Sequence, residues 1–306
     1  MLRGHTRLAG VVTGLIAAAV LLAAAAIAAP AAQAAPTAQA AQAAATTAKT
    51  QASAPSGVAA PWAELANATT GADLWSRDST AQRPMGSIAK VMTAYVVIEA
   101  GGLNRAFTVP KGITGYDNEY GASTAGLKPG ERYTALQLLY ALLIPSGCDA
   151  AYTLADMYGP GTNQFIAKMN ATAKKLGLTK THFTDFSGLP DPTEYSTYSS
   201  ARDLISLGRD AMSLAVFRQI VALKTYHLAA DPWHGAHTWT NYNSLLWTYS
   251  GAIGIKTGQT AAAGACLLFE ARRGSKTLIG VVLHSSSFSL TPAFSDATKM
   301  LNWGFA

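Results

Sequence analysis

Helical patterns dominate the middle of the chain. In SIAKVMTAYVVIEAGG, residues 87–102, apolar residues recur at helical spacing and two glycines provide a stop signal, so we predict a buried helix. The next apolar helix is predicted to end at Pro145 and Gly147, and Asp149 would cap or charge the first turn of the helix after it. The predicted helices of this region span residues 87–102, 134–147, 149–159, 163–178 and 201–213.

Strand patterns lie on both sides of these helices. Residues 62–79 contain two apolar pieces separated by turn residues, which predicts a strand, a turn and a strand. Residues 251–260 and 263–286 are also typical of strands, with a hairpin connection at residues 273–276, and a last helix is predicted at residues 296–305. This order predicts an α/β fold with an antiparallel sheet flanked by helices plus an all-helical lobe. Active sites often lie in the cleft between two such lobes.

The first 34 residues have the pattern of a secretory signal peptide. Arg3 and Arg7 precede a long uncharged apolar run, and small residues follow up to Ala32-Gln33-Ala34, which suits cleavage. We therefore predict a signal peptide at residues 1–34 and an exported protein. The alternative is an uncleaved anchor, because residues 8–29 are long enough to span a bilayer at roughly 20 residues. Membrane association is expected only in that case.

Composition changes twice after this segment. Residues 35–57 are rich in Ala, Thr, Gln and Pro and have little to bury, so we predict a flexible linker, with the folded domain at residues 58–306. No second span of about 18 apolar residues occurs. The chain carries 23 Lys and Arg against 17 Asp and Glu, and losing Arg3 and Arg7 would lower the net charge from +6 to +4. Without a run of basic residues, this charge gives no reason to expect nucleic-acid binding.

Ser87 and Lys90 form the first candidate for chemistry. If Ser87 opens the helix, Lys90 lies one turn later on the same face, so a neutral amine could take the serine proton. The helix N-terminus would favour both a neutral lysine and an anionic transition state. Ser-x-x-Lys alone matches many proteins by chance, and Ser87 could be only a helix cap. Lys256-Thr257-Gly258 strengthens the catalytic interpretation, because it places a cation at a strand end where Gly258 leaves room for a ligand.

Three motifs in this order resemble the active-site motifs of serine penicillin-recognising enzymes: Ser87-Ile88-Ala89-Lys90, Ser146-Gly147-Cys148 and Lys256-Thr257-Gly258. The surrounding segments LKPGE at 127–131, YSSARDL at 198–204 and GIKTGQT at 254–260 most resemble the low-molecular-mass D-alanyl-D-alanine carboxypeptidases and transpeptidases, peptidase family S11. The resemblance covers roughly residues 60–305 and implies a β-lactamase/transpeptidase-like fold.

The resemblance implies a reaction on peptidoglycan stem peptides that end in D-Ala-D-Ala. Ser87 would attack the carbonyl between the two D-alanines and form an acyl-enzyme, with Lys90 as its base and Ser146 relaying the proton to the leaving nitrogen. The backbone N–H groups of Ser87 and Gln259 would form the oxyanion hole. β-Lactams mimic this amide, so penicillin should acylate Ser87.

Substrate binding is also implied by the resemblance. Lys256 and Thr257 would hold the terminal carboxylate, beside Gly258, and Cys148 would take the place of the usual asparagine of the second motif. The family implies a cell-wall location, in the wall or at the outer face of the cytoplasmic membrane, and no metal or other cofactor. We expect a monomer of the single-domain form, since the chain ends at Ala306, soon after the last predicted helix. A cysteine in this motif position is found among enzymes described as DD-transpeptidases.

Two other readings of these motifs stay open. A class A β-lactamase shares them but needs a glutamate-bearing loop, and the corresponding region with Glu194 lacks the E-x-x-L-N context. A catalytically impaired penicillin-binding wall protein would have a binding role, and its only support is Cys148 in place of asparagine. Water or an amine can attack the acyl-enzyme, so the sequence does not separate carboxypeptidase from transpeptidase.

Cys148 and the remaining candidates carry weaker signals. Cys148 is not expected to be a nucleophile, because Ser87 and Lys90 already supply one with its base. Export permits a disulfide with Cys266, but we favour two free thiols, because a bridge would restrict the cleft.

Three histidines and three aromatic residues are further candidates. His234 and His237 have a spacing that could suit a metal, yet no acidic or cysteine partner is near in sequence, so we predict a surface loop. His182 is predicted to be structural. The aromatics Trp239, Tyr242 and Trp247 are predicted to support the core rather than the cleft.

Overall fold

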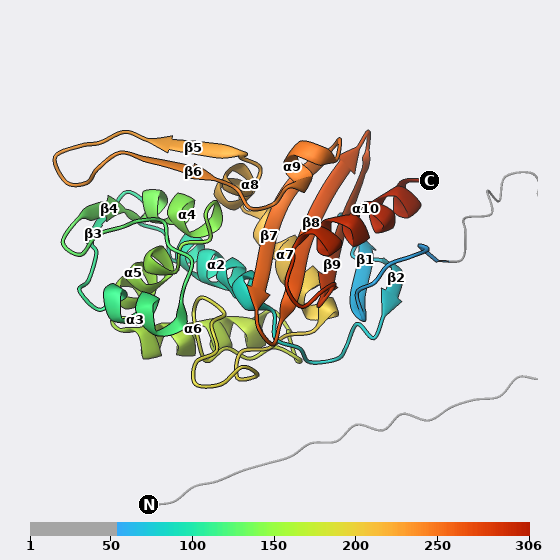
Figure 1. Cartoon of the computed structure of the whole chain (residues 1–306), viewed down its shortest axis with the longest axis horizontal. Helices are drawn as coiled ribbons and strands as arrows, with labels where there is room; N and C mark the ends of the chain where they lie inside the picture. Colours follow the sequence, from blue (N-terminus) through green and yellow to red (C-terminus); the bar gives the residue numbers. More distant parts are fainter. Residues whose placement is uncertain (1–53) are drawn as a thin grey trace, which may run out of the picture. The chain divides into compact units, whose positions relative to one another are not determined.

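The computed structural model describes residues 54–306, and the predicted signal peptide and most of the predicted linker lie outside them. Five antiparallel strands form one sheet in the order β2-β1-β9-β8-β7 (Figure 1). Its first hairpin joins β1 (Trp62–Asn67) to β2 (Asp73–Arg77), as predicted. The Asn67 side chain accepts hydrogen bonds from the N–H groups of Thr69 and Thr70, which is the turn chemistry expected of asparagine.

The C-terminal strands confirm the prediction made from residues 251–286. They are β7 (Ala252–Thr260), β8 (Gly264–Arg273) and β9 (Lys276–Leu283). Arg273 pairs with Lys276 across a two-residue turn in which Gly274 has a φ of 57°. A positive φ at this point is what a tight hairpin requires, and glycine adopts it without steric cost.

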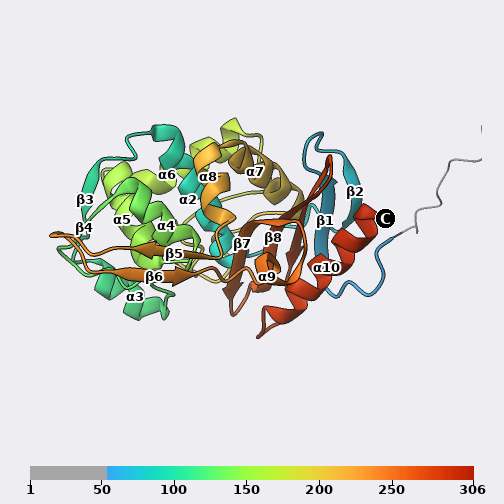
Figure 2. The ribbon, with the colours of Figure 1, turned by 90° about the horizontal axis from the view of Figure 1, so that it is seen from above.

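Helices cover both faces of the sheet. α10 (Thr291–Phe305) packs on one face and α7 (Ala201–Ser213) on the other, as the two views together show (Figures 1 and 2). The side chains of Phe269, Met300 and Leu301 belong to the buried cluster under α10. Because both faces are covered, residues 264–271 of β8 are all buried, and the strand shows no alternation of polar and apolar residues.

A helical lobe adjoins β7 and contains the other long helices. The predicted helices are confirmed, with shifts of a few residues at their ends. The short 3₁₀ turn η1 (Gly86–Ala89) leads into α2 (Lys90–Ala100), and the lobe also contains α3 (Ile113–Tyr120), α4 (Ala135–Leu143), α5 (Cys148–Tyr158), α6 (Thr162–Lys175) and α8 (Ala215–Val221). Figure 1 shows α2 running through the middle of this lobe, between the sheet and the other helices. The strand-then-helix order therefore gives the predicted sheet plus helical lobe.

Shorter elements, α3 and α8 among them, were not predicted. β3 (Ala106–Thr108) pairs with β4 (Arg132–Thr134), and β5 (Thr225–Leu228) pairs with β6 (His237–Thr240) in a hairpin that extends over the helical lobe, with α9 (Leu245–Thr248) following (Figure 1). Strands of three or four residues carry too few positions to show a period. None of the described helices is long and apolar enough to cross a membrane.

The hairpin corrects the prediction of a surface loop at His234 and His237. The His234 side chain is only 1% exposed, stacks on the ring of Tyr133 and lies 3.2 Å from the Asp231 carboxylate, so the expectation of no acidic partner was wrong. His237 belongs to β6, and its Nε2 lies 2.9 Å from the Tyr133 hydroxyl. Among the described residues, no group of three or more His, Cys, Asp or Glu is arranged to hold a metal.

Candidate active site

Ser87 and Lys90 meet at the junction of η1 and α2. Ser87 is the second residue of the 3₁₀ turn and Lys90 the first residue of the α-helix, so the predicted one-turn separation holds. The Lys90 ammonium nitrogen, Nζ, lies 2.8 Å from Ser87 Oγ. This distance permits direct proton transfer between the two groups.

Lys90 is fully buried and has three hydrogen-bond acceptors. Besides Ser87 Oγ, its Nζ donates to Cys148 Sγ at 3.2 Å and to the Ser187 carbonyl at 3.1 Å. An ammonium group has three N–H bonds, so these contacts satisfy it. The arrangement holds the amine in one position behind Ser87. Cys148 therefore contacts the lysine.

Ser146 lies in the turn between α4 and α5. Its φ of 62° is in the left-handed region, and its carbonyl accepts a hydrogen bond from Ser123 Oγ at 2.8 Å. The Cys148 N–H donates in turn to the Ser123 carbonyl at 2.8 Å, so the 121–127 loop holds this turn in place. Ser146 Oγ is buried and has no hydrogen-bond partner among the described residues. Its hydroxyl is thus available to a group entering the site.

Asp149 binds the same loop, residues 121–127, through backbone hydrogen bonds. The helix-capping role predicted for it was incomplete, because its carboxylate accepts hydrogen bonds from the N–H groups of Ala125 and Leu127 as well as from Ala150 at the start of its own helix. Burial raises the pKa of Asp149, while these backbone donors act in the opposite direction. This residue links α5 to the loop that faces Ser146.

β7 carries the third motif along the opposite side of the site. Lys256 is only 2% exposed, and its Nζ donates to the Thr257 carbonyl at 3.1 Å. Burial, together with the neighbouring Lys90 ammonium, lowers the pKa of Lys256 well below its ordinary value. The buried Lys256 amine therefore loses its proton more readily than an exposed lysine does.

Glycines let β7 approach the turn that carries Ser87. A Cβ on Gly258 would collide with the Met85 carbonyl, and one on Gly86, whose φ is 53°, would lie 2.6 Å from the backbone nitrogen of Gln259. We predicted that the missing side chain at Gly258 leaves space for a ligand. It also allows the backbone of β7 to pack against the turn that carries Ser87. This contact brings the Gln259 N–H beside the N-terminus of η1, where the Ser87 N–H lies.

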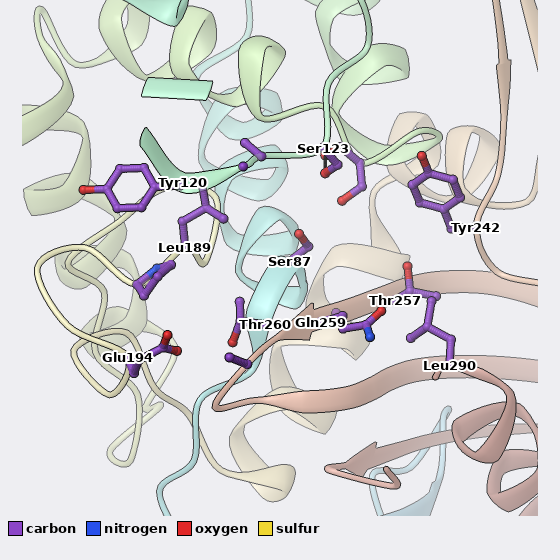
Figure 3. A pocket seen from close by; sticks show the side chains of 16 residues that line it. Ser87, Tyr120, Ser123, Leu189, Glu194, Tyr242, Thr257, Gln259, Thr260 and Leu290 are labelled. Carbon is purple, nitrogen blue, oxygen red and sulfur yellow. Dashed lines mark hydrogen bonds between the residues drawn. The ribbon is translucent and has the colours of Figure 1, made fainter. Parts of the chain in front are cut away.

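A cavity of about 570 Å³ opens between the two sides of the site. Five predicted site residues line it: Ser87, Ser146, Thr257, Gly258 and Gln259. Figure 3 shows Ser87 between Thr257 on one side and the loop residues Leu189 and Glu194 on the other. The other three predicted site residues, Lys90, Cys148 and Lys256, are buried and do not line the cavity.

Other cavity residues carry no recognisable signal in the sequence. Tyr120, Ser123 and Leu290 come from segments without a recognisable motif. Tyr242 lines the cavity and is 50% exposed, and Trp247 is 45% exposed, so the core role predicted for both was wrong, whereas Trp239 is buried as predicted. Tyr242 and Trp247 follow the short strand β6, and their sequence pattern does not distinguish an aromatic residue in a cavity wall from one in the core.

Asp185 organises the segment that contacts Lys90. Its buried carboxylate accepts hydrogen bonds from the N–H groups of Ser187 and Leu189 at 2.7 and 2.9 Å, and from the Tyr116 hydroxyl at 2.6 Å. These bonds fix the Ser187 carbonyl that faces Lys90 Nζ. Burial raises the pKa of Asp185. The sequence gave no sign of this role, because it depends on the folded path of the loop.

Both cysteines are free, so the disulfide alternative was wrong and the two-thiol prediction is confirmed. Cys266 lies on β8 and pairs in register with Gly258, whereas Cys148 lies at the start of α5. Burial raises the pKa of the Cys266 thiol to about 12.

The sequence profile of the D-alanyl-D-alanine carboxypeptidases, peptidase family S11, matches residues 47–287. The chain belongs to this family. The D-alanyl-D-alanine carboxypeptidase of Streptomyces sp. (strain K15) is 43% identical over 252 residues, covering 78% of this chain and 85% of that protein. The carboxypeptidase DacB2 of Mycobacterium tuberculosis is 39% identical over 243 residues, covering 79% of this chain and 81% of that protein.

Solved structures agree with the fold. The crystal structure of the Streptomyces K15 DD-transpeptidase matches with a TM-score of 0.76 at 42% identity, covering 81% of this chain and 97% of that one. The predicted sheet with helices is therefore confirmed as the fold of this D-alanyl-D-alanine carboxypeptidase family. The protein is a serine-type D-Ala-D-Ala carboxypeptidase/transpeptidase, a penicillin-binding enzyme of the peptidoglycan.

Proposed function

We propose that Ser87 is the nucleophile of this enzyme and Lys90 its general base, acting on peptidoglycan stem peptides that end in D-Ala-D-Ala. The observation that carries the proposal is the 2.8 Å contact between Lys90 Nζ and Ser87 Oγ at the floor of the cavity. Ser87 Oγ bonds to the carbonyl carbon of the penultimate D-alanine, and the bond from that carbon to the last nitrogen breaks. The proton of the serine passes to the leaving amine.

The two buried lysines have different tasks. A substrate carboxylate near Thr257 stabilises the positive charge of Lys256, which lies directly behind it. Lys90 accepts the serine proton through its amine, which lies 2.8 Å from Ser87 Oγ.

Ser146 completes the path of the proton. Ser146 lines the cavity, and its buried hydroxyl has no partner among the described residues, Lys90 included, so the relay requires this hydroxyl to bridge Lys90 and the leaving nitrogen once the substrate is bound. The 121–127 loop, held by Asp149, keeps this serine in its left-handed turn. Ser146 thus acts as the relay.

Backbone groups stabilise the developing charge. The N–H groups of Ser87 and Gln259 would donate to the oxyanion, and such a donor is commonly worth on the order of 3 kcal/mol. Thr257 contacts the terminal carboxylate with its hydroxyl. The Lys256 side chain is buried and donates to the Thr257 carbonyl, so Lys256 acts on the carboxylate through its charge and not through a direct contact. Cys148 positions Lys90 rather than the substrate, since it is buried and does not line the cavity.

The acyl-enzyme can pass its acyl group to water or to an amine. Both acceptors would enter the cavity once the last D-alanine has left, so the enzyme would work as a carboxypeptidase or as a transpeptidase according to the acceptor at hand. We propose that the folded domain acts as a monomer outside the cytoplasmic membrane, in the wall or at the outer face of the membrane. The support for export is the pattern of residues 1–34.

Release of D-alanine from a model stem peptide, with increasing amounts of a glycine acceptor, tests the proposal. We expect release in every case, and formation of the amine-linked product at the expense of the hydrolysed one as the acceptor concentration rises. Acylation by penicillin without D-alanine release would instead favour a binding role. Release without any amine-linked product at high acceptor concentration would contradict the transpeptidase activity.

A further inference from the structure

Glu194 is the only charged residue among the sixteen described residues that line the cavity. One of its carboxylate oxygens, Oε2, accepts a hydrogen bond from the Ala262 N–H at 3.3 Å, at the turn between β7 and β8. The other oxygen has no hydrogen bond or ion pair with any of the described residues. A carboxylate in a cavity whose other walls are uncharged is a marker for a positively charged ligand group.

The position of Glu194 relates it to one end of the substrate. Figure 3 shows Glu194 on the opposite side of Ser87 from Thr257. A peptide whose terminal carboxylate lies at Thr257 and whose scissile carbonyl lies at Ser87 must continue past Ser87 toward Thr260 and Glu194. The residue that precedes D-Ala-D-Ala therefore lies at the Glu194 end of the cavity.

The electrostatic field at this end is also negative. Burial and the neighbouring carboxylates of Asp191 and Glu119 raise the pKa of Tyr120, another residue of the same wall, to about 12. The buried Lys256 lies at the other end, behind Thr257. The cavity therefore has a negative end at Glu194, opposite the Thr257 end, where a bound carboxylate stabilises the positive charge of Lys256.

We propose that Glu194 selects stem peptides in which the residue before D-Ala-D-Ala carries a free side-chain amine, an inference that rests on the proposed function. The ammonium group donates to the unpaired oxygen of Glu194, while the Ala262 N–H holds the carboxylate in place. The contact is made before and after acylation alike, so Glu194 is a specificity residue that affects binding of the donor peptide rather than the chemical step.

Two peptides test this selectivity directly: Nα-acetyl-L-lysyl-D-alanyl-D-alanine, with a free side-chain amine, and its diacetylated form, without one. For the enzyme we expect kcat/KM to be about 5-fold higher on the free amine, as for a partly screened ion pair. In Glu194→Gln this preference disappears through loss on the amine peptide alone. High salt should weaken the preference of the enzyme and leave that of Glu194→Gln unchanged.

Charge reversal makes the test more stringent. Glu194→Lys should disfavour the amine peptide and gain activity on a peptide with glutamate in the same position. Glu99→Gln is the matched control, because Glu99 is exposed and does not line the cavity, so it changes net charge only. The rate of penicillin acylation reports folding of each variant, since penicillin lacks the side chain that Glu194 would contact.

The outcomes separate this inference from the proposed function. D-Alanine release from both peptides at equal kcat/KM, or an equal preference in Glu194→Gln and the unaltered enzyme, would overturn the role of Glu194 and leave the proposed function intact. No release from either peptide would overturn the proposed function, and the inference with it. An amine preference lost in Glu194→Gln and kept in Glu99→Gln is the result that we expect.

Discussion

Single residues around Lys90 hold the proposed base beside Ser87. The motif residues Ser87, Lys90 and Ser146 could be chosen from the sequence, because their spacing and order carry the signal. Asp185 could not, because the hydrogen bonds that its carboxylate accepts from the N–H groups of residues 187 and 189 exist only in the folded loop. The motif spacing thus indicates the groups that we propose to react, and the folded loop adds the groups that hold them.

Asp185 should act as a positioning residue through its hydrogen bonds rather than its charge. In Asp185→Ala the buried N–H groups of Ser187 and Leu189 lose their acceptor, at about 1 to 3 kcal/mol for each unsatisfied group, and the Ser187 carbonyl moves from Lys90. We expect kcat to fall about 10-fold or more, with a smaller change in KM. Asp185→Asn should restore most of the rate, because its amide oxygen can accept the same two bonds. Equal losses in both variants would refute this role.

Thiol chemistry provides a second test at this scale. Both cysteines are free and fully buried, and burial raises the pKa of Cys266 to about 12. Iodoacetamide at pH 8 should therefore label neither thiol appreciably in the folded protein and both in denaturant without reductant, as counted by mass spectrometry. Fewer than two labelled thiols in the denatured protein would mean that a disulfide exists.

Among the elements, the β5–β6 hairpin supports the wall of the cavity from outside. Trp239 on β6 donates from Nε1 to the Ala125 carbonyl at 2.8 Å, and Tyr226 on β5 stacks on Tyr140 of α4 with ring centres 3.9 Å apart. The hairpin thus contacts the 121–127 loop, which Asp149 also binds through the N–H groups of Ala125 and Leu127. Its strands were not predicted, since four residues with mixed polarity show no clear period.

Removing the tryptophan hydrogen bond should loosen this loop. For Trp239→Phe we expect a loss of about 1 kcal/mol in the free energy of unfolding, the usual value of one hydrogen bond, together with a raised KM. Trp233→Phe is the control, because Trp233 lies in the same hairpin and is 56% exposed. Urea unfolding and peptide kinetics measure both effects. Equal effects of the two substitutions would show that the Ala125 contact is unimportant.

The same hairpin should make stability depend on pH. Burial lowers the pKa of His237 below 6.5, so the folded state favours the neutral ring. The contribution is therefore fully present above pH 6.5 and is lost as the pH falls through the lower pKa of the folded state. We expect the melting temperature to fall more between pH 7.5 and 5.5 in the unaltered protein than in His237→Gln. An equal fall in both proteins would contradict this assignment.

Across the molecule, the order of elements explains why the site lies where two groups of elements meet. The two ends of the described chain build the sheet, and the helices between them build the lobe, so β7 meets η1 and the turn before α5 at one place (Figure 1). This arrangement could be predicted from the element order, because long periodic helices and strands carry most of it. The composition of the cavity wall could not, since Tyr120, Glu194 and Tyr242 come from loops and helix ends.

The central claim is that Ser87 forms the acyl-enzyme and Lys90 activates it. Incubation with benzylpenicillin, followed by protease digestion and mass spectrometry, tests this directly. We predict one adduct on the peptide that contains Ser87, no adduct in Ser87→Ala, and acylation slowed by about 100-fold or more in Lys90→Ala, the range of a lost general base. An adduct that persists in Ser87→Ala, or an unchanged rate in Lys90→Ala, would contradict the account.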